Sequence, residues 1–123
     1  NFSCLKEAVE IISIEIYEFS AARKSVFRTL HLNSRLHSTL LESDKLVDRK
    51  SIYRRLAGLL LKFNNEIKVE NQSRAADTAI FMMITSLLEK VLYPSLTPAI
   101  ASELNAEELT HELSKIVLPY LTT

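Results

Sequence analysis

The chain has 123 residues, 15 basic and 15 acidic side chains, and a formal net charge of zero. This length suits one domain with its own core, and the charge balance argues against a stand-alone nucleic-acid binder, which is normally strongly basic. A single glycine, Gly58, excludes glycine-rich phosphate and dinucleotide loops, and Cys4 alone excludes an intrachain disulfide. Composition and apolar pattern together predict a soluble all-helical domain that dimerises.

Helical periodicity predicts a first helix that begins near Leu5, with Ser3 as its N-cap. Its apolar positions recur at 3.6-residue spacing opposite an acidic face, and they are Leu5, Ala8, Val9, Ile12, Ile16 and Phe19. Ile11 and Ile14 interrupt the acidic face and suggest a second contact. A less regular segment follows from about Ala22. Its apolar face consists of Val26, Phe27 and Leu30, and residues 33–44 are expected to form a loop or a broken helix.

A third helix is predicted from a regular apolar face. Its members are Ile52, Tyr53, Leu56, Leu59, Leu60, Phe63 and Ile67. The polar stretch that follows, from Asn64 and Asn65 through residues 68–73, is predicted to be the connection to the next helix.

The fourth and fifth helices are the most apolar part of the pattern. The fourth, from Arg74 to about Tyr93, carries apolar residues around nearly its whole circumference. It therefore runs through the middle of the domain, or it packs one face on the core and another on a second chain. The fifth begins at Asn105, which with Glu108 has the spacing of a capping box, and Pro119 falls in its last turn.

The sequence holds no recognisable catalytic or metal-binding pattern. His31, His37 and His111 have no second ligand at the i,i+3 or i,i+4 spacing that a helical metal site needs. We therefore expect neither metal nor cofactor, and no enzyme activity. No apolar run approaches the ~20 residues of a membrane span, so we expect no membrane contact, and the lone thiol suggests a reducing, cytoplasmic compartment.

The order of these segments resembles the C-terminal domain of TetR-family transcriptional regulators. The similarity is carried by RAADTAIFMMITSLLEKVLYPSLTPAIASELNAEELTHELSKIVLPYL (Arg74 to Leu121) and by EAVEIISIEIYEFSAARKSVFRTLH (Glu7 to His31). The resemblance implies an all-α bundle of five to six helices, with residues 1–123 as one regulatory domain. The family's N-terminal helix-turn-helix is not matched here, so DNA contact would lie outside these residues, and we expect the chain to be part of a longer protein.

The resemblance also implies two sites. A small apolar or amphipathic effector would bind between the early helices and shift the spacing of the DNA-reading heads in a repressor dimer. The candidate pocket residues are Phe19, Phe27, His31, Tyr53, Leu56, Phe63, Met82 and Met83. The polar side chains available to hydrogen-bond such an effector would be those of Arg28, His31, Tyr53, Thr78 and Thr85. The candidate homodimer interface consists of Ala79, Ile80, Met83, Leu87, Val91, Leu109, Leu113, Ile116, Val117 and Tyr120.

Two other functions remain open at this point. A helical adaptor that binds a protein partner would have a filled core and no ligand pocket. A cavity between the first four helices would therefore favour the effector-binding domain, and its absence would favour the adaptor. An enzyme within a helical bundle would need buried polar residues that converge on one point, with Glu15, His31 and His111 as the residues to test.

Overall fold

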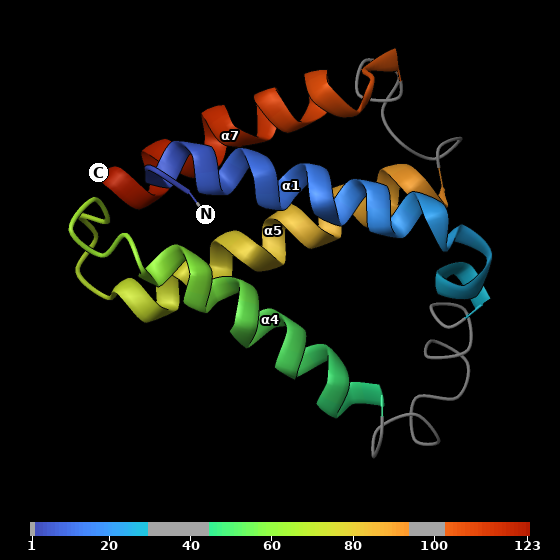
Figure 1. Ribbon diagram of the computed structural model, residues 1–123, viewed down its shortest axis with the longest axis horizontal. Helices are drawn as coiled ribbons and strands as arrows, with labels where there is room; N and C mark the ends of the chain where they lie inside the picture. Colours follow the sequence, from blue (N-terminus) through green and yellow to red (C-terminus); the bar gives the residue numbers. More distant parts are fainter. Residues whose placement is uncertain (1, 30–44, 94–102) are drawn as a thin grey trace.

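The computed structural model describes residues 2–29, 45–93 and 103–123, with backbone only for residues 45–50. Four long helices account for most of these residues: α1 (Leu5–Ala22), α4 (Lys45–Leu61), α5 (Gln72–Leu92) and α7 (Ala106–Thr122). Residues 24–29 form a short helix directly after α1, and the described part of the chain contains no strand. The predicted all-α bundle is thus confirmed (Figure 1).

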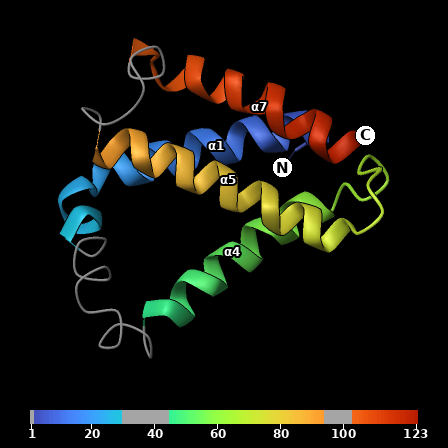
Figure 2. The same ribbon diagram turned by 180° about the vertical axis from the view of Figure 1, so that it is seen from behind.

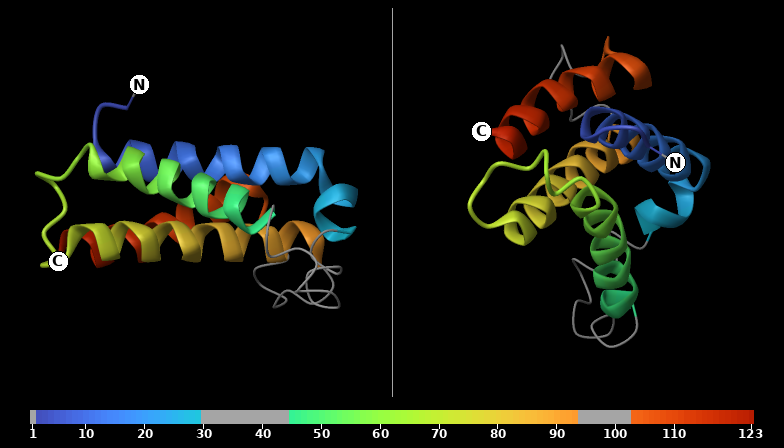
Figure 3. Two further views of the ribbon diagram at one scale, coloured as in Figure 1. Left: turned by 90° about the horizontal axis from the view of Figure 1, so that it is seen from below. Right: turned by 60° about the vertical axis from the view of Figure 1, so that its left-hand side comes forward.

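Helices α1 and α5 form the middle of the bundle. Each of them contacts the other three long helices, with α7 packed on one side of the pair and α4 on the other. Figure 2 shows this order from behind, and Figure 3 shows that α4 leans away from the bundle at its N-terminal end. Of the two positions predicted for the fourth helix, the structure places it in the middle of the domain.

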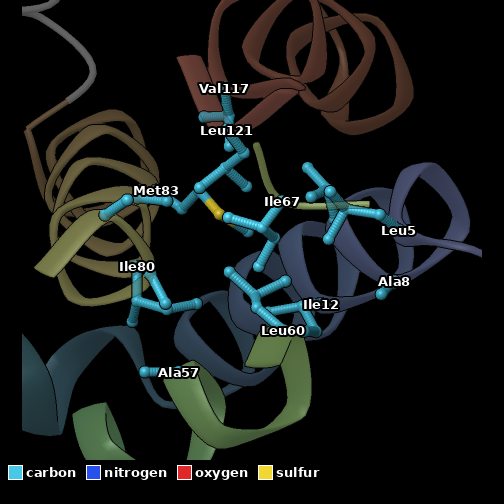
Figure 4. Close-up of a cluster of buried hydrophobic side chains, with 14 of the residues drawn as sticks. Leu5, Ala8, Ile12, Ala57, Leu60, Ile67, Ile80, Met83, Val117 and Leu121 are labelled. Carbon is cyan, nitrogen blue, oxygen red and sulfur yellow. The ribbon is translucent and has the colours of Figure 1, made fainter. Parts of the chain in front are cut away.

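The core is built around the inward side of α5. Met83 and Ile80 on α5 meet Leu5 and Ile12 of α1, Leu60 of α4 and Leu121 of α7 in one cluster of buried side chains (Figure 4). A second cluster joins Leu87 of α5 to Leu109 and Leu113 of α7. The broad apolar circumference of α5 therefore follows from its contacts with three neighbouring helices.

The helix termini agree with the sequence in part. Asn105 accepts a hydrogen bond from the Glu108 amide at 2.8 Å, and its own amide donates to the Glu108 carboxylate at 2.9 Å, which confirms the capping box. α5 begins at Gln72, two residues before the predicted start, because Asn71 caps it through the Arg74 amide. The helix α7 continues through Pro119 to Thr122, as predicted for a proline in a last turn.

Two predictions about helix ends are wrong. Ser3 does not cap α1, because the N-cap residue is Cys4 and the Ser3 hydroxyl donates to the Glu7 carboxylate instead. The third helix ends at Leu61, so Phe63 lies in the turns that follow it, and Ile67 lies in the irregular segment after those turns. Ile67 is nevertheless only 2% exposed, because the connection folds back into the core. Because a buried apolar residue lies beyond the end of the helix, the apolar spacing predicts a longer helix than the structure contains.

Candidate functional site

Four of the eight candidate pocket residues meet in the core. Met83 is fully buried in the main cluster, and Tyr53, Leu56 and Phe63 are partly buried against the same cluster. They come from α4, the connection after it and α5. The structure thus brings these four together as packed side chains that fill space between helices.

The other candidates lie elsewhere. Phe19, near the end of α1, is 50% exposed, and its ring centroid lies 5.7 Å from that of Phe27 in the short helix. The guanidinium of Arg23 lies over the Phe19 ring, 3.9 Å from its centroid, at a distance typical of a cation–π contact. Met82 is exposed on α5, and His31 lies outside the described residues. Phe19 and Met82 were expected on covered faces, and the described residues leave both partly in solvent.

Two hollows on the surface of the described residues bear on this question, and both are open to solvent. One, of about 390 Å³, lies between α4 and α5 and is lined by Tyr53, Arg54, Asp77, Thr78 and Phe81. The other, of about 570 Å³, is lined by residues 70–73 at the start of α5. The first combines two aromatic rings with a cation, an anion and a hydroxyl, a set that suits an amphipathic molecule. Tyr53 is the only candidate pocket residue in either hollow.

Sequence reasoning missed Arg54 and Asp77 in this hollow. The apolar periodicity of each helix does not show that α4 and α5 bring these two side chains to one groove. Thr78, named among the polar side chains for an effector, does line it, although its hydroxyl donates to the Arg74 carbonyl oxygen at 2.8 Å.

Most of the candidate interface residues are buried inside a single chain. Eight of the ten are covered by neighbouring helices: Ala79, Ile80, Met83, Leu87, Val91, Leu109, Leu113 and Val117. A side chain covered in this way cannot also contact a second chain unless the helices separate. Contacts within the chain, around α5, therefore already explain the apolar character of these eight residues.

A smaller apolar surface remains on the outer sides of α5 and α7, which contact each other. We call it the outer α5–α7 surface, and it consists of Met82, Ile116 and Tyr120. Ile116 is 57% exposed and Tyr120 43%, and their spacing of four residues places them on one face of α7. Both had been assigned to the interface, whereas Met82 had been assigned to the candidate pocket.

The shifted titratable groups lie on the surface. Hydrogen bonds from Ser3 hold the pKa of the Glu7 carboxyl below its usual value. Lys115, whose Nζ lies 2.7 Å from Glu112 Oε2, lowers the pKa of the Glu112 carboxyl in the same direction. Among the described residues, no three His, Cys, Asp or Glu side chains are grouped closely enough to hold a metal ion. His111, one of the residues named for an enzyme test, is exposed on α7.

Comparisons with known proteins yield no match to the chain, whether with protein-family models, curated proteins or solved structures. None of the helices described here has the length and apolar character needed to cross a membrane. The arrangement of the helices and the surfaces that they leave uncovered are therefore the basis for assigning a function.

Proposed function

We propose that this chain is the effector-sensing and homodimerisation domain of a TetR-like transcriptional repressor that acts in the cytoplasm. The proposal is supported by the order of the helices and by the sequence resemblance of α5 and α7 to the family's last two helices. DNA would be read by a part of the protein outside these residues. The observation that carries the dimer is the outer α5–α7 surface.

A second copy is a suitable partner for that surface. Met82, Ile116 and Tyr120 are large apolar side chains that remain 38–57% exposed on two neighbouring helices. Each square ångström of apolar surface removed from water contributes roughly 25 cal/mol, so covering three such side chains in both copies favours association. A two-fold axis would place the same patch of each copy against the other, and the resulting dimer would match a palindromic operator.

Charge placed in the patch tests the dimer. Ile116→Lys puts a charge at the centre of the proposed contact and is expected to shift the mass measured by light scattering from dimer to monomer. Ile11→Lys makes the same substitution on α1, where Ile11 is 36% exposed, and is expected to leave the dimer intact. Equal effects of the two substitutions, or no effect of either, would refute this interface.

The effector part of the proposal rests on α4 and α5. Tyr53 packs against the core and also lines the open hollow between these helices, beside the charged Arg54 and Asp77. An amphipathic fluorescent probe such as anilinonaphthalene sulfonate should saturate one site per chain. Tyr53→Ala should weaken this binding, whereas Ile52→Ala on the same helix should not. Binding that never saturates would contradict a defined effector site.

A second function, the protein-binding adaptor without a ligand pocket, is favoured by one observation. Tyr53, Leu56, Phe63 and Met83 pack into the core cluster, as the side chains of a filled bundle do. In this case no small apolar molecule would raise the melting temperature, and the outer α5–α7 surface would bind a different protein. Thermal melting with a panel of apolar acids and amines distinguishes the two proposals.

A further inference from the structure

The first turn of α1 has no cap from its own neighbourhood. The first four amides of a helix have no partner within the helix and need another acceptor. The N-cap residue Cys4 makes no side-chain capping bond, and the hydroxyl of Ser3 donates to Glu7. The acceptor for this end of α1 must therefore come from elsewhere in the chain.

That acceptor is Glu66, which lies in the connection between α4 and α5. The amide of Leu5 donates to Glu66 Oε2 at 3.1 Å, across 61 residues of sequence, in a part-buried position. A carboxylate is well suited to this place, because the helix dipole leaves partial positive charge at the N-terminus. Glu66 thus satisfies from a distance one of the amides that the first turn of a helix leaves without a partner inside the helix.

The connection that carries Glu66 is itself held on several sides. The side-chain amide of Gln72 donates to the carbonyl oxygens of Asn64 and Ile67, at 2.9 Å each. The amide of Lys68 donates to the carbonyl oxygen of Leu121 at the end of α7, also at 2.9 Å. The buried side chain of Ile67 packs in the core beside Leu5 and Leu121 (Figure 4). The connection is therefore a fixed support joined to α5, α7 and the core.

We infer that Glu66 is a positioning residue that ties the first turn of α1 to the α4–α5 connection and so fixes the start of α1 relative to α5 and α7. The regulatory meaning of this tie rests on the proposed function. In such a regulator, α4 would border the effector and the DNA-reading head would precede α1. Glu66 would then lie on the route between them.

Amide exchange measured by NMR tests the tie on the intact chain. Glu66→Ala removes the acceptor, and since cap removal changes a local equilibrium by a factor of roughly 2 to 30, the Leu5 amide should exchange faster by about that factor. Glu66→Gln keeps a carbonyl oxygen and should restore part of the protection. Glu70→Ala removes an exposed carboxylate from the same connection and should leave Leu5 exchange unchanged.

Two results would overturn the inference. One is equal Leu5 exchange in Glu66→Ala and Glu70→Ala. The other is a uniform acceleration across α1, α5 and α7, which would mean that Glu66 acts only on global stability. The test is independent of the proposed function: a selective effect at Leu5 in a chain that neither dimerises nor binds an effector would support the tie and reject the regulator.

Discussion

Thr110 on α7 offers a prediction whose sign can be read directly from the structure. Thr110 is 2% exposed, and its hydroxyl oxygen has no hydrogen-bond partner among the residues that the structure describes. Elsewhere in the helices a threonine hydroxyl donates to the carbonyl oxygen four residues earlier, as Thr122 does to Leu118 at 2.8 Å. Thr110 therefore carries the cost of a buried polar group without the bond that would offset it.

Replacing this hydroxyl with a methyl group should stabilise the protein. Valine has nearly the same shape as threonine and the same branching at Cβ, so packing and helix propensity change little. Leaving a buried hydroxyl unpaired costs about 1–3 kcal/mol, and Thr110→Val should recover about that much. For a chain of this length, 1 kcal/mol corresponds to a rise of about 4 °C in melting temperature.

Thermal and chemical unfolding of matched variants check this reasoning. Thr122→Val removes an exposed, bonded hydroxyl and should change stability by less than about 0.5 kcal/mol. Thr110→Ser keeps the hydroxyl, removes a buried methyl group and should destabilise the protein. A Thr110→Val variant less stable than the parent chain would refute the reasoning, because it would show that the hydroxyl makes a favourable bond in solution.

Three further predictions follow from individual side chains. Gly58 lies inside α4, and a Cβ added there would have nothing within 4 Å among the described residues. Gly58→Ala should therefore raise the free energy of unfolding, measured by urea titration, by roughly 0.5–1 kcal/mol. A decrease would contradict the open space around this position. Met83→Ala should lower the free energy of unfolding by about 2–5 kcal/mol in the same assay, because Met83 is fully buried. Met82→Ala should lower it by less than about 0.5 kcal/mol, because Met82 is exposed. Similar losses in the two variants would contradict this burial pattern. Lys115→Met should raise the pKa of Glu112 toward its usual value in a carboxyl NMR titration. The lowered pKa of folded Glu112 stabilises the protein above the unfolded-state pKa, and this stabilisation is lost as the pH falls through the folded-state pKa. The variant should therefore lose less stability than the parent chain on acidification. An unchanged Glu112 titration would exclude the ion pair.

The helices themselves could be predicted because their signals are local. Apolar spacing located α1, α4, α5 and α7, and the pairing of Asn105 with Glu108 located the start of α7. The end of α4 could not be predicted, because Ile67 keeps the apolar spacing although the helix stops at Leu61. Its burial depends on a fold-back that only the tertiary structure determines.

The candidate sites were harder to predict, because an apolar residue in sequence does not show what covers it. Leu87 and Ile116 fit an interface equally well as sequence, yet one is fully buried in the chain and the other is 57% exposed. The cap of α1 shows the same limit, since Glu66 acts across 61 residues on a helix whose local sequence pointed to Ser3. Contacts between distant segments determine both outcomes.

The most direct test of the proposed regulator is the mass of the unmodified chain in solution. Sedimentation equilibrium between about 1 and 100 µM should give twice the chain mass of 14.0 kDa, because two copies cover the outer α5–α7 surface. A mass of 14.0 kDa throughout that range would contradict the proposed dimer and leave Met82, Ile116 and Tyr120 to a partner of another kind.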